Sequence, residues 1–180
     1  KIIVGIVPIV ERLEYAVADS SAINDAPDTR MLPFEDSFDD WTMHEDMWST
    51  AMLDGNNIAL VIDYYEYGLV APAATYRWST TNNYNEALNT RELRTADRAN
   101  TVLRFQLRLR NSENVTTDYL TVEVTSDGGK TWKEVNTFDN SNGTFEWTTF
   151  QYDLGKYLDS DLFKVRFRAH GANAKWINYW

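Results

Sequence analysis

The chain has 180 residues, which is enough for one domain with a sizeable core. Its net charge is -10 and it has no cysteine, so nucleic acid is not an expected partner and disulfides and thiolate metal sites are excluded. Aromatic residues make up 14% of the sequence, which favours strands over helices. The apolar residues 1–10 are too few to span a bilayer, so no membrane insertion is expected.

The N-terminal segment, residues 1–31, ends in a small, polar, turn-rich stretch at residues 19–30. Residues 1–10 are typical of a strand or of the remnant of a signal sequence, and the lack of a small-residue cleavage site before Glu11 favours the strand. The segment therefore either belongs to a preceding domain or adds an edge strand. Residues 32–180 are predicted to form the main domain.

Alternating and apolar runs in the main domain predict a series of short strands. They lie at residues 58–67, 75–78, 101–110, 119–124, 132–135, 145–152, 163–169 and 175–180. Residues 79–100 have weak periodicity and are predicted to be a loop with one short strand or turn near residues 87–93, and residues 170–174 are predicted to be a turn. Short strands at this spacing without a long helix indicate an all-β fold, an antiparallel two-sheet sandwich.

The stretch between residues 119–124 and 132–135 predicts a β-hairpin. Asp127 can accept hydrogen bonds from nearby backbone amides, and Gly128 and Gly129 tolerate positive φ. The stretch also resembles the Asp-box, S/T-x-D-x-G-x-T-W, at every fixed position from Thr125 to Trp132. That motif marks a hairpin in sialidases and many secreted β-domains and is structural. A single copy cannot make a propeller, so a sialidase fold is not expected.

From residue 32 onward the order of elements resembles the jelly-roll family that includes MAM-type domains and bacterial cleaved-adhesin domains. The segments that carry this resemblance are Pro-Phe-Glu-Asp at 33–36, Leu-Arg-Phe-Gln-Leu at 103–107, the hairpin at 120–132, Tyr-Asp-Leu at 152–154 and the strand at 163–168. The resemblance implies a two-sheet jelly-roll that is galactose-binding-like. The family's closing I-D-D/N-I motif is absent before Trp180, so we expect the sandwich to be cut within its last strand.

Acidic residues cluster at the start of the main domain. Glu35, Asp36 and Asp39 supply carboxylate oxygens of the kind that Ca²⁺ prefers, and the resemblance implies a structural calcium here, with Asp39 the best match in position. The family's C-terminal acidic partner is missing, and the spacing is not that of an EF-hand. A structural calcium and a solvated acidic loop therefore both remain open.

Two further groups of residues suggest ligand binding. The aromatic residues Tyr76, Trp78 and Tyr84 predict a platform on which sugar rings stack, although alternation directs about half of such residues into the core. If the strands at 101–110 and 163–169 are neighbours, Arg108 and Arg166 belong to a basic stripe for an anionic glycan or an acidic protein. Ordinary cross-strand pairing with acids such as Glu123 is the alternative.

The sequence contains no catalytic motif: G-x-S-x-G, H-E-x-x-H and Walker patterns are absent, and the two histidines are far apart. We therefore predict a non-enzymatic adhesion, binding or spacer domain of a larger secreted or cell-surface protein, bacterial in origin. Its partners would be a host or matrix protein, a glycan or neighbouring domains of the same polypeptide. The alternative is a carbohydrate-binding module attached to a secreted hydrolase.

Overall fold

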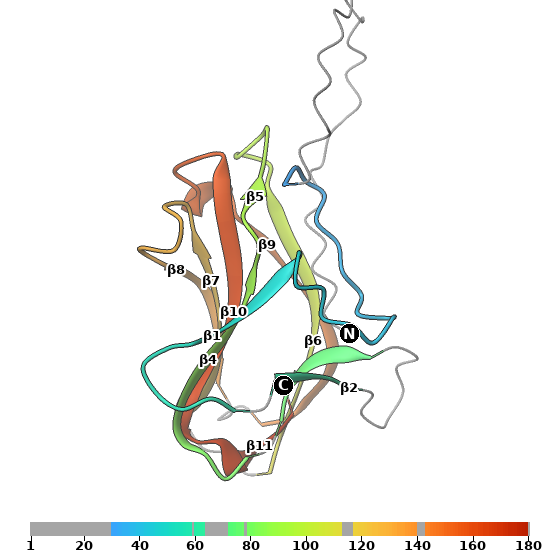
Figure 1. Ribbon diagram of the computed structural model, residues 1–180, viewed down its shortest axis with the longest axis vertical. Coiled ribbons are helices and arrows are strands. Elements are labelled where there is room, and N and C mark those ends of the chain that lie inside the picture. The colour runs from blue at the N-terminus through green and yellow to red at the C-terminus, as the bar shows by residue number, and fades with distance from the viewer. Residues whose placement is uncertain are drawn as a thin grey trace, which may run out of the picture.

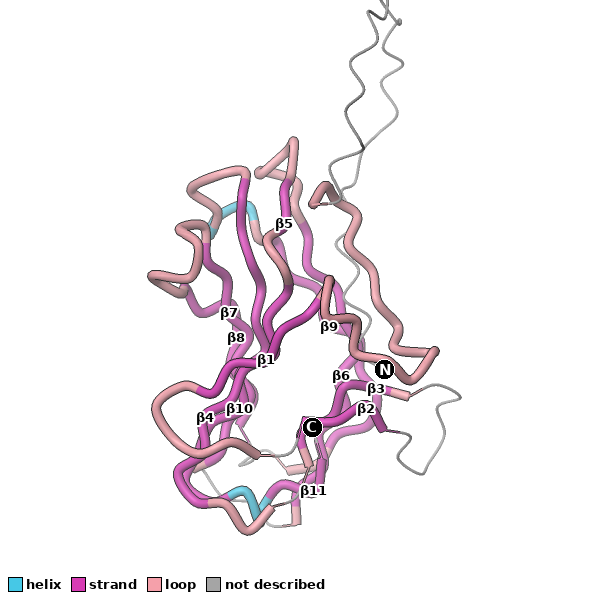
Figure 2. The backbone as a smooth tube through the Cα atoms, viewed as in Figure 1, coloured by secondary structure: helices cyan, strands magenta, loops and turns pink. Residues whose placement is uncertain are grey.

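The computed structural model describes residues 30–58, 60–63, 72–77, 79–112, 117–139 and 143–179. Within these ranges the chain forms strands joined by loops and two single 3-10 turns (Figure 2). The strands are β1 (Trp48–Met52), β2 (Leu60–Asp63), β3 (Ala73–Tyr76), β4 (Asn82–Thr90), β5 (Leu93–Arg94), β6 (Val102–Asn111), β7 (Asp118–Thr125), β8 (Lys133–Asp139), β9 (Phe145–Asp153), β10 (Leu162–Asn173) and β11 (Ile177–Tyr179). The 3-10 turns are η1 (Gly155–Tyr157) and η2 (Ala174–Trp176). Among the described residues, no helix is long and apolar enough to cross a membrane.

The strands form two layers. The first sheet has the order β1-β4-β10-β7-β8, with β5 paired to the start of β10. The second layer contains the sheet β11-β6-β9 and the β2-β3 hairpin. Figure 1 shows β4, β7, β8 and β10 together on one side of the molecule, with β6 and β2 on the other. All strand pairs are antiparallel, and the predicted all-β two-sheet jelly-roll sandwich is confirmed.

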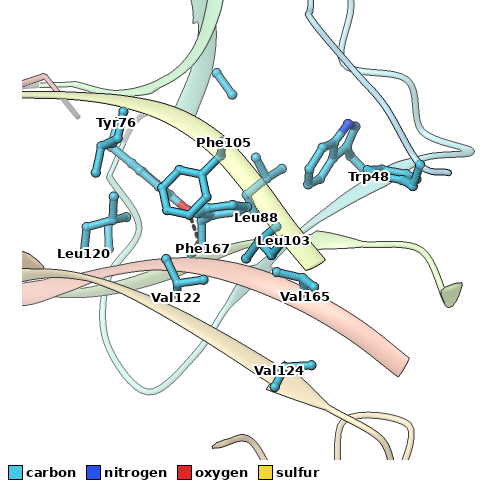
Figure 3. Close-up of a cluster of buried hydrophobic side chains, with 14 of the residues drawn as sticks. Trp48, Tyr76, Leu88, Leu103, Phe105, Leu120, Val122, Val124, Val165 and Phe167 are labelled. Atoms are coloured by element: carbon cyan, nitrogen blue, oxygen red, sulfur yellow. Dashed lines mark hydrogen bonds between the residues drawn. The ribbon is translucent and has the colours of Figure 1, made fainter. Parts of the chain in front are cut away.

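The core fills the space between the two layers. Phe105 of β6 and Phe167 of β10 are buried and meet edge to face, with ring centroids 5.1 Å apart. Tyr76 of β3 crosses the same space, and its hydroxyl donates a hydrogen bond of 2.9 Å to the carbonyl of Phe167 (Figure 3). Burying each large apolar side chain contributes about 1.5–3 kcal/mol. The alternating residues of β6 and β10 therefore join the two sheets.

The predicted hairpin between β7 and β8 is confirmed by their pairing. Gly128 and Gly129 occupy the turn at φ values of 75° and 96°, which residues with a Cβ rarely adopt. Asp127 accepts hydrogen bonds from the hydroxyl and the amide of Thr131, at 2.6 and 3.0 Å, and from the hydroxyl of Thr125 at 2.7 Å. These bonds, from Thr131 first, lower the pKa of Asp127. Asp127 thus caps its own turn, as predicted.

The prediction of a loop over residues 79–100 is wrong. Residues 82–90 form β4, which lies between β1 and β10 in the first sheet. Its inward positions include Glu86 and Thr90 beside Tyr84 and Leu88, so the apolar alternation is broken although all four residues are buried. The predicted turn at residues 170–174 is also wrong, because β10 continues to Asn173 along β4 and β7.

The first described residues and the last strand both pair with strands of the main domain. Residues 1–29 lie outside the described residues, as does the part of the strand prediction at residues 64–67. The described chain already joins the sheet at its start, because Leu32 donates to the carbonyl of Arg94 at 3.1 Å and Arg94 donates to the carbonyl of Arg30 at 2.7 Å. At the other end, β11 pairs with the end of β6.

Candidate ligand-binding face

The outer side of the first sheet carries a set of polar and aromatic side chains from four strands and one turn. The register places Arg166 of β10 between Asn89 of β4 and Glu123 of β7, and it places His170 between Asn85 and Tyr119. Their side chains alternate with the inward residues of the same strands, so they share one face. We define the polar face as Asn85, Asn89, Tyr119, Thr121, Glu123, Trp132, Thr137, Arg166, Arg168 and His170.

An ion-pair cluster forms the centre of the polar face. Glu123 Oε2 accepts hydrogen bonds from Arg166 Nε at 2.6 Å and from Arg168 Nε at 2.9 Å. The carboxylate is buried, with 7% of the residue exposed. Burial alone would raise the pKa of Glu123, but the hydrogen bonds from the two arginines outweigh it and the pKa is lowered. Glu123 therefore remains ionised and fixes both guanidinium groups.

Trp132 holds Arg166 from the side of the hairpin turn. The guanidinium carbon of Arg166 lies 4.0 Å from the centre of the indole ring, which is a cation–π contact. The indole is itself fixed, because Nε1 donates a hydrogen bond of 3.2 Å to the carbonyl of Gly129. The Asp-box resemblance implies a structural role for Trp132 in the hairpin, and the structure also places its ring against the ion-pair cluster.

A second aromatic group lies at the other end of the face. The imidazole of His170 stacks on the ring of Tyr119 with centroids 5.2 Å apart, and its Nε2 lies 2.9 Å from the hydroxyl of Thr121. That hydroxyl is also 3.1 Å from the hydroxyl of Thr137. Burial, and next the charge of Arg168, lower the pKa of His170 to about 4. The imidazole is therefore neutral at physiological pH.

The loop that follows β1 borders the polar face at Asn85. Asn85 donates from Nδ2 to the carbonyl of Asp54 at 3.3 Å, and the amide of Leu53 donates to the carbonyl of Asn85 at 2.9 Å. Asn89 likewise donates from Nδ2 to the carbonyl of Ser49 at 3.4 Å. Both amide side chains are thus oriented by β1 and its loop, and both remain partly exposed.

The two described residues of the predicted aromatic platform, Tyr76 and Tyr84, do not lie on a surface. Tyr76 and Tyr84 are 3% and 1% exposed, so neither ring offers a face on which a sugar could stack. The hydroxyl of Tyr84 donates to Asp118 at 2.9 Å, and burial together with the charge of Asp118 raises the pKa of Tyr84. Both tyrosines are core residues, because alternation turns them inward. Trp78 lies outside the described residues.

The predicted basic stripe is wrong as well. Arg108 belongs to β6 and Arg166 to β10, and these strands lie in different layers that meet through their inner faces. Arg108 is 4% exposed and pairs with Glu146 of β9 at 2.9 Å. Arg166 pairs with Glu123, as the alternative prediction of cross-strand pairing proposed. The two arginines therefore cannot bind one ligand.

The acidic residues near the start of the main domain have structural contacts. Asp36 accepts hydrogen bonds from the amide of Phe38 at 2.8 Å and from the indole of Trp48 at 2.7 Å. Glu35 and Asp39 are exposed. Among the described residues, no group of three or more Asp, Glu or His side chains is arranged to hold a metal ion. Calcium binding at these three residues stays a prediction.

Comparison with known proteins gives similarities among solved structures alone. No protein-family model matches the chain, and no curated protein matches it. Among solved structures, the chain is similar to the carbohydrate-binding module TmCBM61, determined in complex with β-1,4-galactotriose. The two chains are 12% identical with a TM-score of 0.48, and the match covers 80% of this chain and 92% of that one. A similarity at this level carries no conclusion about what this chain binds.

Proposed function

We propose that this domain is a non-catalytic binding domain of an extracellular protein and that it binds glycans through the polar face. The observation that carries the proposal is the ordered array on the outer side of the first sheet, where Glu123, Arg166 and Arg168 are fixed by one another. Ordered donors and acceptors lose little conformational entropy when a ligand binds. A bound sugar has several hydroxyl groups, and each of them needs a hydrogen-bond donor or acceptor on the protein.

The two aromatic groups suit the same class of ligand. Trp132 and Tyr119 are both half-buried, so each keeps part of its ring on the polar face. They flank the ion-pair cluster, because Trp132 contacts Arg166 and Tyr119 contacts His170. From Tyr119 to Val124, where the strand approaches Trp132, β7 rises by roughly 17 Å. This length fits an oligosaccharide rather than a single sugar.

The histidines support a non-catalytic role. His170 is engaged with Thr121 and Tyr119, and His44 lies in the loop before β1 with its Nε2 2.8 Å from Asp40. A general base must direct its own proton-accepting nitrogen at a substrate. Both imidazoles instead have partners that account for their positions.

A glycan array tests the proposal with three variants. We expect the unmodified domain to bind at least one class of oligosaccharide, and we expect Trp132→Ala and Tyr119→Ala to weaken that binding. Trp41→Ala is the control, because Trp41 is 55% exposed, lies in the loop before β1 and is not part of the polar face. Loss of binding in the Trp41 variant alone would move the site to that loop. Silence of the unmodified domain across the array would favour a protein-adhesion or spacer role.

A further inference from the structure

The guanidinium group of Arg166 is fixed in position, but its two terminal nitrogens make no hydrogen bond within the described residues. Its Nε is bonded to Glu123 and its guanidinium plane rests on Trp132. Among the described residues, Nη1 and Nη2 of Arg166 have no hydrogen-bond partner. Arg168 differs, because its Nη1 reaches Asn85 at 3.5 Å and its Nη2 reaches Glu123 at 3.4 Å. Arg166 therefore presents a fixed fork of two donors.

The charge around this fork is positive although the chain is acidic. Arg166 and Arg168 share one carboxylate, that of Glu123, which leaves one positive charge at the centre of the face. His170 adds none, because its pKa is lowered to about 4. Lys164 adds a positive charge at one end of β10, and the exposed Glu134 lies across from Glu123 at the β8 edge. The whole chain has a net charge of -10.

We propose that the glycan bound by the polar face carries a carboxylate, as a uronic acid does, and that Arg166 binds it through Nη1 and Nη2. This inference rests on the proposed function. A carboxylate has two coplanar oxygens that match the two donors of a guanidinium, which gives a bidentate contact. The indole of Trp132 already fixes the guanidinium plane, so little of its freedom is lost on binding.

The neighbours of the fork fit a sugar that carries a carboxylate. The side chain of Asn89 lies beside Arg166 and is anchored by its own Nδ2, which leaves Oδ1 as an acceptor for a hydroxyl group. A backbone N–H of an acidic peptide can use the same acceptor, so competition with an acidic peptide is needed to distinguish the two ligands. A uronic acid supplies both the carboxylate and the hydroxyl groups within one ring.

Titration calorimetry with paired ligands tests the inference. The probes are oligosaccharides of galacturonate, glucuronate and mannuronate, each beside its methyl ester, which removes the charge and keeps the sugar. We expect one acid to bind and its ester to bind about tenfold more weakly or worse. Arg166→Lys should give a similar loss for the acid, because an ammonium keeps the charge but cannot form the fork. Arg104→Ala, an exposed arginine of the other layer, should have no effect.

The outcomes separate this inference from the proposed function. Equal binding of an acid and its ester would overturn the carboxylate while leaving glycan binding in place. Displacement of the acid by polyglutamate at similar concentration would overturn it in favour of an acidic peptide. If neither charged nor neutral glycans bind, the proposed function is refuted, and so is the inference that the glycan carries a carboxylate. Circular dichroism of each variant confirms that a lost affinity is not a lost fold.

Discussion

The neutral imidazole of His170 should make the stability of the domain fall on mild acidification. His170 lies against Tyr119 and Thr121, with Arg168, Arg166, Glu123 and Asp118 as the charges that act on it. Its pKa is about 4 in the folded protein, whereas a histidine in an unfolded chain has a pKa of about 6.5. Between these values the unfolded state binds the proton and the folded state does not, so stability rises with pH.

The size of the effect follows from the shift in pKa. A difference of this extent corresponds to about 3 kcal/mol at about 1.4 kcal/mol per pKa unit. Because His170 is only partly buried, solvent screening reduces the expected contribution to about 1–2 kcal/mol. The stability should be lost as the pH falls from about 6.5 towards 4 and should be fully present above that window.

Urea unfolding at pH 7.0 and 4.5 of the unmodified domain and of His170→Gln measures this contribution. The carboxylates titrate in both proteins, so the difference between their pH dependences isolates His170. We expect the unmodified domain to lose about 1–2 kcal/mol more than His170→Gln on acidification. His44→Gln is the matched control, because His44 lies in the loop before β1 and is not part of the polar face. Equal pH dependences in the unmodified domain and His170→Gln would refute the assignment of a partly buried, neutral imidazole.

Three further predictions concern other parts of the molecule. Burial raises the pKa of Glu86, so stability should be lost as the pH rises through that pKa, and Glu86→Gln should be more stable than the unmodified domain at pH 8 but not at pH 4 in urea unfolding. Gly171→Ala should cost about 1–3 kcal/mol or prevent folding, because its Cβ would lie 2.7 Å from Asp118 Cα; a melting temperature within error of the unmodified domain would contradict this. The predicted calcium site implies that EDTA lowers the melting temperature of the unmodified domain but not that of Asp39→Ala, and an unchanged melting temperature would rule the site out.

The strands that could be predicted are those whose inward positions are all apolar. In β6, Leu103, Phe105 and Leu107 alternate with polar residues, and burial follows this pattern. β4 was missed because Glu86 and Thr90 occupy inward positions, where they interrupt the apolar alternation. A polar side chain at an inward position is tolerated only where neighbouring strands surround it. A pattern along a single strand cannot show that cover.

The polar face could be predicted only in part, for a related reason. Alternation directs the side chains of Arg166 and Arg168 outward, and the sequence shows this. It does not show that β10 lies between β4 and β7 rather than beside β6, and the pairing partner decides which residues meet. Glu123 and Trp132 come from β7 and the hairpin turn, so the cluster exists only in the folded sheet. The burial of Tyr84 depends in the same way on the strands around it.

Glycan binding at the polar face is tested most directly by mapping a bound glycan with NMR. Backbone amide shifts of the labelled domain are recorded during titration with the glycan that binds most strongly on the array. The account predicts that the largest changes fall on β4, β7 and β10 and on the hairpin turn, centred on Glu123, Trp132 and Arg166. Changes centred on β6 and β9, or on the loop around Trp41, would contradict it.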